Sequence, residues 1–286
     1  MTDETRDKIF LLGVGCQKGG TSWLHSQLKT LPEVNLGLTK EYQVLEVHFG
    51  GADAVMKKRL DRAQGAIESL EALREKALLI RLLTFHAEIR NYYEYFNYLW
   101  LRHTDVRVVG DLTPANAVLS TKALAEVKFE LEKRGFTVKV VFLMRDPIER
   151  IWSAVRMARR DSVRDGNPVV GDEETQMREA FAVPATEART RYERTIERVD
   201  SVFDEDDVFY TFYEKLFEAE THADIKAFLG LSSFEPDIGV KVNASAKSEL
   251  ALSADLQREM YDYYAETYEY CDRRFNTSSI WSNHRR

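Results

Sequence analysis

The chain has 286 residues, of which 44% are hydrophobic and 30% are charged, as in an ordinary globular protein near the upper size of a single core. Its formal net charge of −7 argues against broad binding to nucleic acids. No apolar run approaches the roughly 18–20 residues that span a bilayer, and residues 1–8 are polar rather than a secretion signal. We therefore expect a cytoplasmic protein without a membrane span.

Cysteine and histidine are too few and too scattered to form a disulfide framework or a metal site. The two cysteines, Cys16 and Cys271, lie far apart in the sequence. None of the six histidines belongs to an H-E-x-x-H or H-x-x-x-H pair. We expect no metal.

The first informative stretch runs from Val14 to Trp23 and reads V-G-C-Q-K-G-G-T-S-W. It joins an apolar run over residues 9–14, typical of a strand, to a helical pattern over residues 22–30. A glycine-rich turn of this kind exposes backbone N–H groups at a helix N-terminus, where an anion such as phosphate is favoured. Lys18 adds a mobile cation, and Thr21 and Ser22 supply hydroxyl donors and a helix cap.

Two common nucleotide motifs match this turn incompletely. Gly15 and Gly20 have the spacing of the G-x-x-x-x-G-K-[ST] loop, but the lysine that should follow Gly20 is absent and Lys18 precedes it. The G-x-G-x-x-G fingerprint fails because Lys18 stands where its third glycine should be. On this stretch alone, a tight turn without a ligand remains an alternative.

The following segment, up to residue 110, predicts a short strand at residues 34–36, polar residues Lys40-Glu41-Tyr42 just beyond it, and then helices. Residues 52–104 have helical spacing and are rich in alanine, leucine and charged residues, so we expect at least two helices inserted between strands. The aromatic run from Tyr92 to Trp100 is expected to pack in the core of this insert. A further strand is expected at residues 106–109, before the turn Gly110-Asp111-Leu112-Thr113-Pro114.

The second informative stretch is Met144-Arg145-Asp146-Pro147-Ile148-Glu149-Arg150-Ile151-Trp152-Ser153. It follows an apolar run at residues 139–143, typical of a strand buried on both faces. Pro147 suits the first turn of a helix capped by Asp146. Arg145 at the strand end and Ser153 about two turns along the helix are then close enough to bind one anion.

The C-terminal half continues with a polar loop at residues 161–171, helical patterns at 173–202 and a last strand at 208–211. Short helices are expected at 213–217 and 223–229, and a polar loop at 243–248. A final helix, about 253–274, places Leu256, Met260, Tyr264, Tyr268, Cys271 and Phe275 on one stripe.

With both stretches known, the chain resembles sulfotransferases that use 3′-phosphoadenosine 5′-phosphosulfate (PAPS), and it looks closer to their bacterial and heparan-type branch. Residues 17–23 are similar to that family's 5′-phosphosulfate loop, P-K-[SAG]-G-T-[ST]-W. Residues 145–153 are similar to its 3′-phosphate site, R-[DN]-P-x-x-R-x-x-S. The separation of about 127 residues between Lys18 and Arg145 also suits the family.

The resemblance implies an α/β fold of three layers, with a central parallel sheet of about five strands flanked by helices. It extends over most of the chain and so predicts a single domain, 1–286, with a helical insert at about 52–104. It implies in-line transfer of a sulfuryl group from PAPS to a hydroxyl or amine, with Lys18 stabilising the leaving phosphate. The PAPS-binding residues that it implies are Gln17, Lys18, Gly19, Gly20, Thr21, Ser22, Trp23, Arg145, Ser153 and, in a late loop, Lys247.

The acceptor must lose a proton as it attacks, and a nearby carboxylate can take it. Glu41 is the preferred base, because bacterial relatives carry K-E at this spacing from the loop. The other candidates are Glu46, His48 and Asp111. Residues 46–49 resemble the E-V-H-F run that carries the base in some heparan-type members.

We expect the acceptor to be a small molecule, lipid or sugar, bound between the 52–104 insert and the 161–171 loop. The aromatic residues and acidic composition favour a neutral or apolar acceptor over a highly sulfated polymer. The alternatives are a divergent nucleotide kinase, with Asp111 as a magnesium ligand, and a nucleotide-binding protein without catalytic activity.

Overall fold

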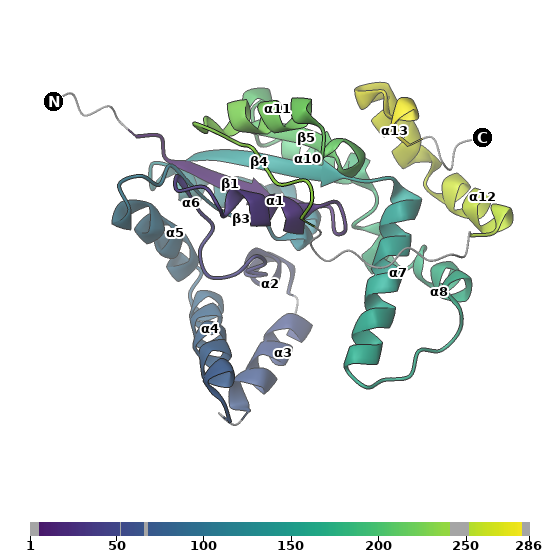
Figure 1. Cartoon of the computed structure of the whole chain (residues 1–286), viewed down its shortest axis with the longest axis horizontal. Helices are drawn as coiled ribbons and strands as arrows, with labels where there is room; N and C mark the ends of the chain where they lie inside the picture. Colours follow the sequence, from purple (N-terminus) through teal and green to yellow (C-terminus); the bar gives the residue numbers. More distant parts are fainter. Residues whose placement is uncertain (1–5, 52, 66–67, 241–251, 282–286) are drawn as a thin grey trace.

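The computed structural model describes residues 6–51, 53–65, 68–240 and 252–281 (Figure 1). Its centre is a sheet of five parallel strands in the order β2-β3-β1-β4-β5. The strands are β1 (Ile9–Gly13), β2 (Val34–Asn35), β3 (Val108–Asp111), β4 (Thr137–Met144) and β5 (Val208–Phe212). The predicted α/β fold with about five parallel strands is confirmed.

Successive side chains of a strand point to opposite faces of the sheet, so the core is divided into two layers. Phe10 and Leu12 of β1 belong to one buried cluster, whereas Ile9 and Leu11 belong to the other. The first cluster joins the sheet to α5 (Arg90–Arg102), α6 (Thr121–Glu132), α10 (Tyr192–Asp200) and α13 (Ala265–Phe275). The second joins it to α1 (Thr21–Leu28) and α11 (Ala219–Leu229). Helices therefore cover both faces of the sheet.

Three helices lie between β2 and β3 after the short α2 (Leu45–Gly50). They are α3 (Asp53–Gln64), α4 (Leu70–Ala87) and α5. Figure 1 shows α3 and α4 as a hairpin that extends away from the sheet. Tyr92, Tyr93 and Phe96 of α5 are buried, as expected of this aromatic run, whereas Tyr98 is exposed.

The remaining helices are η1 (Pro114–Val118), α7 (Pro147–Arg164), α8 (Glu173–Ala180), α9 (Pro184–Glu187), η2 (Glu205–Asp207), η3 (Tyr213–Lys215), α12 (Ala254–Tyr263) and η4 (Thr277–Ser279). None of the helices in the described ranges is long and apolar enough to cross a membrane.

Several sequence-based boundaries were wrong, among them those of β3, α7 and the final helix. Strand β3 continues through Gly110 and Asp111, because Gly110 faces Leu11, whose carbonyl oxygen would lie 2.3 Å from any Cβ at position 110. Helix α7 continues to Arg164, so the polar loop begins later than residue 161. The final helix is broken at Tyr264, whose buried side chain donates to the carbonyl of Phe181; α12 and α13 are separate helices.

The tight packing under the first loop leads to a stability prediction for Gly19→Ala. A Cβ at Gly19 would lie 2.4 Å from the carbonyl oxygen of Leu143 and 2.7 Å from Sγ of Cys16. The carbonyl belongs to a central strand and cannot move aside, so we expect a loss of about 3 kcal/mol in the free energy of unfolding, measured in urea. Gly50→Ala is the control, since no atom lies within 4 Å there; its effect should stay within about 1 kcal/mol. Equal effects of the two variants would contradict this account.

Candidate active site

The glycine-rich loop is held against β4 by main-chain hydrogen bonds that extend the β1–β4 pairing. The amide of Val14 donates to Val141 (3.0 Å), that of Cys16 to Leu143 (2.6 Å), and that of Leu143 to Gly15 (3.0 Å). Cys16 is fully buried, and burial raises the pKa of its thiol. The cysteine is a packing residue of the loop, and the loop's conformation is set by the sheet.

The residue that caps α1 differs from the prediction. The N-cap is Gly20, at φ 96°, which has no side chain to accept from the first turn; Thr21 and Ser22 lie inside that turn. A Cβ at Gly20 would also lie 2.5 Å from Leu216. Glycine at this position thus leaves the amides of the first turn without a side-chain cap, in the arrangement that binds anions at helix N-termini.

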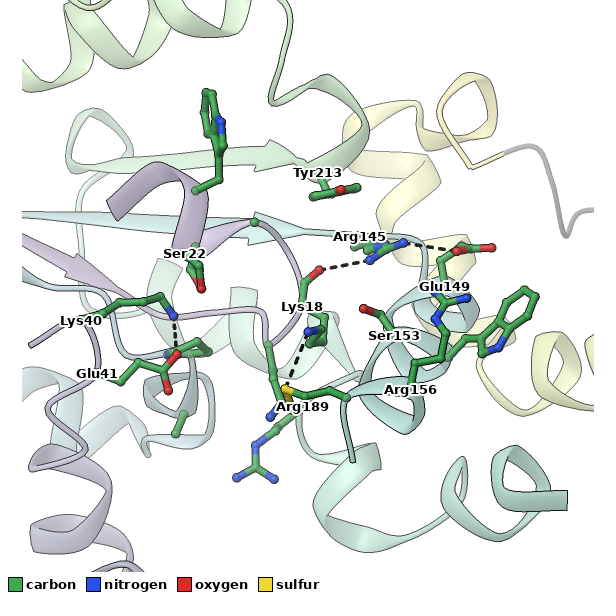
Figure 2. A pocket seen from close by; sticks show the side chains of 18 of the residues that line it. Lys18, Ser22, Lys40, Glu41, Arg145, Glu149, Ser153, Arg156, Arg189 and Tyr213 are labelled. Atoms are coloured by element: carbon green, nitrogen blue, oxygen red, sulfur yellow. Dashed lines mark hydrogen bonds and ion pairs between the residues drawn. The ribbon is translucent and has the colours of Figure 1, made fainter. Parts of the chain in front are cut away.

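One cavity of about 1230 Å³ brings the two sequence motifs together (Figure 2). Its lining includes every predicted site residue in the described ranges except Gly19, which is a buried residue of the loop: Gln17, Lys18, Gly20, Thr21, Ser22, Trp23, Glu41, Arg145 and Ser153. Lys247 lies outside the described residues. Elements that are far apart in the sequence therefore converge on a single cavity.

Lys18 lies at the centre of this cavity and is not neutralised by a described carboxylate within ion-pair distance. Its Nζ contacts Sδ of Met157 at 3.7 Å. Partial burial, together with the neighbouring cations Arg160, Arg145 and Lys40, lowers the pKa of Lys18. An anion bound beside Lys18 would relieve this repulsion, so the electrostatics of the cavity favour anionic ligands.

Arg145 follows β4 and turns toward the loop. Its guanidinium donates to the carbonyl of Lys18 (3.4 Å) and to the carboxylate of Glu149 (3.2 Å), and it lies 4.5 Å from the centre of the Tyr213 ring. Its buried Nε has no hydrogen-bond partner. As predicted, Asp146 caps α7, accepting from the amides of Ile148 (2.9 Å) and Glu149 (3.1 Å).

Glu41 also lines the cavity, with its side chain 39% exposed and paired with Lys40. The backbone of the next residue, Tyr42, is fixed on both sides. Its amide donates to Oγ1 of Thr113 (2.9 Å), and its carbonyl accepts from Arg59 of α3 (2.6 Å). The Tyr42 ring is fully buried against α4 and α5. The helical insert therefore holds the loop that presents Glu41.

The other candidate bases occupy different environments. Glu46 lines the cavity and is largely buried, and burial raises the pKa of its carboxyl group. His48 is exposed on α2 and does not line the cavity. Asp111 is buried outside the cavity, and its two oxygens accept from Thr113 (2.5 Å) and Tyr92 (2.9 Å). A carboxylate held in this way supports the Thr113–Tyr42 contact and is unsuited to bind a metal in the cavity.

Several lining residues were missed from the sequence. Arg156 and Arg160 follow Ser153 by three and seven positions on α7 and so share its helix face, a spacing that could have revealed them. Arg189 follows the one-turn helix α9, where no periodic pattern points to the cavity. Of the two segments expected to bind the acceptor, the 52–104 insert contributes Val55 alone to the described lining, and the 161–171 loop contributes none.

Neither a family model nor a curated protein matches the sequence. Solved structures do match, and they assign the class of fold. The crystal structure of a sulfotransferase from Alicyclobacillus acidocaldarius is similar over 91% of this chain and 92% of that chain, with a TM-score of 0.57 and 18% identity. The sulfotransferase domain of the Synechococcus PCC 7002 olefin synthase matches over 92% of this chain and 96% of that domain, with a TM-score of 0.46 and 14% identity.

The chain thus has the α/β nucleotide-binding fold, in the form found in sulfotransferases. The resemblance inferred from the two sequence motifs is confirmed at the level of the fold.

The buried Asp111 leads to a prediction about pH and stability. Burial raises the pKa of Asp111 from 3.8 to about 6 in the folded protein. Folding then favours the protonated form, so this contribution to stability is complete below pH 3.8 and is lost as the pH rises through about 6. Between pH 4 and pH 7, the free energy of unfolding of the wild type, measured in urea, should fall by about 2–3 kcal/mol relative to that of Asp111→Asn. A difference between the two proteins that stays constant with pH would contradict the prediction.

Proposed function

We propose that the protein is a PAPS-dependent sulfotransferase that transfers a sulfuryl group to a hydroxyl or amine of a small molecule, lipid or sugar. The observation that carries the proposal is the single cavity lined by Lys18, Glu41, Arg145 and Ser153. Anion-binding groups from two motifs and a carboxylate base thereby surround one reaction volume. We further propose that residues 1–286 act as one cytoplasmic domain.

The residues at one end of the cavity suit the two phosphate groups of PAPS. The uncapped first turn of α1 and the ammonium of Lys18 would hold the 5′-phosphosulfate. Arg145 and Ser153 would hold the 3′-phosphate, with the unpartnered Nε of Arg145 and the nearby Arg156 as further donors. The ring of Trp23 packs edge-on against Phe217, with 5.0 Å between the ring centres, and supplies aromatic surface for the adenine ring of PAPS. We call these residues the nucleotide end.

PAPS would supply an activated sulfuryl group on a phosphate leaving group. Glu41 accepts the proton of the acceptor hydroxyl as the hydroxyl oxygen bonds to sulfur. Lys18 stabilises the charge that grows on the phosphate oxygen as its bond to sulfur breaks. The Lys40 ammonium pairs with Glu41 and orients its carboxylate. Thr113 and Arg59 act through Tyr42 to fix the position of Glu41.

The nucleotide kinase remains a weaker candidate. It would require a magnesium ligand, and Asp111 has both oxygens committed to Thr113 and Tyr92 away from the cavity. No observation specifically favours a role without catalysis.

Nucleotide selectivity tests the 3′-phosphate site. We expect adenosine 3′,5′-bisphosphate to bind much more tightly than AMP or ATP in calorimetry, because Arg145 pairs with the extra phosphate. Arg145→Ala should weaken that binding by about 30–100-fold, or about 2–3 kcal/mol, with little effect on AMP. Arg62→Ala is the control, since Arg62 pairs with Glu75 on the α3–α4 hairpin. Equal affinity of the wild type for all three nucleotides would refute the 3′-phosphate site.

Two variants separate catalysis from binding once an acceptor is known. Glu41→Gln should lower kcat by about 10²–10⁴-fold and leave the affinity for adenosine 3′,5′-bisphosphate unchanged, because the base contacts the acceptor. Lys18→Ala should lower both kcat and the affinity for adenosine 3′,5′-bisphosphate. Glu46→Gln and the exposed His48→Gln should lower kcat less than about tenfold. A larger loss in Glu46→Gln than in Glu41→Gln would assign the base to Glu46 instead.

A further inference from the structure

The lining of the cavity contains an arginine that the proposed nucleotide site does not use. We call six lining residues outside that nucleotide site the acceptor end: Glu41, Gln43, Glu46, Val55, Ala115 and Arg189. In the view of Figure 2, Lys18 lies between Arg145 of the nucleotide end and Arg189. A molecule attacked near Lys18 and deprotonated by Glu41 would therefore extend toward Arg189. This inference rests on the proposed function.

The guanidinium of Arg189 is left available by the way its neighbours pair. Glu187, two residues earlier, accepts from Arg191 (3.2 Å) and from Arg194 (3.3 Å). Arg189 makes one hydrogen bond, from Nη1 to the carbonyl of Ala185 (3.0 Å), and no described carboxylate lies within 4.0 Å of it. Arg189 is one of the residues that line the cavity (Figure 2).

Glu46 does not cancel the charge of Arg189. Burial raises the pKa of the Glu46 carboxyl group, and Arg189 is the charge that most opposes this rise. The two side chains nevertheless remain beyond ion-pair distance. Over the whole described lining, Lys18, Lys40, Arg145, Arg156, Arg160 and Arg189 outnumber the carboxylates Glu41, Glu46 and Glu149, although the chain as a whole is acidic.

We propose that the acceptor is a hydroxy acid whose carboxylate binds Arg189 while its hydroxyl faces Glu41. A guanidinium with free donors matches a planar carboxylate, which it can bind through two parallel hydrogen bonds. A single cation flanked by Glu46 and Glu41 suits a monoanion better than a phosphate dianion, which the two glutamates would repel. The acceptor is thus anionic, in place of the neutral acceptor favoured by overall composition.

The test is calorimetric titration of the protein saturated with adenosine 3′,5′-bisphosphate. The ligands are 4-hydroxybenzoate, 3-hydroxydecanoate, the methyl ester of each, and 4-hydroxyphenyl phosphate. At least one acid should bind about tenfold or more tightly than its own ester, and more tightly than the phosphate. Arg189→Gln should abolish this preference and Arg189→Lys should retain part of it. Arg62→Gln, which changes an arginine on the α3–α4 hairpin outside the cavity, should leave the preference unchanged.

Four results would overturn the inference. They are equal binding of acids and esters or no binding of any acid, a preference that survives Arg189→Gln, and tighter binding of the phosphate. The first step of the same experiment tests the proposed function separately. If adenosine 3′,5′-bisphosphate fails to bind, the proposed function fails as well; if it binds and the acids behave like their esters, the hydroxy-acid assignment alone is wrong.

Discussion

The pairing of β1 with β4 is the constraint on which the site depends. It continues beyond the end of β1 as hydrogen bonds between the loop and Leu143, so the loop and the first residues after β4 form one rigid unit. Lys18 and Arg145 belong to the two halves of that unit, and Arg145 donates to the carbonyl of Lys18. Because carboxyl ends of parallel strands share one sheet edge, the two motifs become neighbours although they are distant in the sequence.

A second, independent contact places the candidate base. Tyr42 is anchored in the aromatic core of α4 and α5, and its backbone is bonded to Thr113 and to Arg59. Since Thr113 follows β3 and Arg59 lies on α3, the position of Glu41 depends on both the sheet and the insert. The insert thus contributes to the site through the backbone of Tyr42, although Val55 is its one described residue in the lining.

The elements predicted correctly were those with a local signal. Buried strands such as β4 appear as continuous apolar runs, and Asp146-Pro147 marks the start of α7 by its capping chemistry. Errors arose where tertiary packing overrides local pattern. Gly110 extends β3 because Leu11 requires a residue without a side chain there, and Tyr264 interrupts a helical stripe because its hydroxyl is bound to Phe181. Arg189 could not have been predicted, because the pairing of Glu187 with Arg191 and Arg194 decides its availability.

The net charge of a chain is a poor guide to the charge of its cavity. Acidic residues dominate the sequence, and many of its arginines are neutralised in surface pairs such as Arg178 with Glu259 and Arg274 with Asp200. Such exposed pairs add little to stability, but they leave the long-range field weak, so that local pairing determines where positive potential remains. Within the described ranges, the cations of the cavity without a contacting carboxylate are Lys18, Arg156 and Arg189. On the proposed function, these cations would bind the nucleotide and the carboxylate of the acceptor in one cavity, although the chain as a whole is acidic.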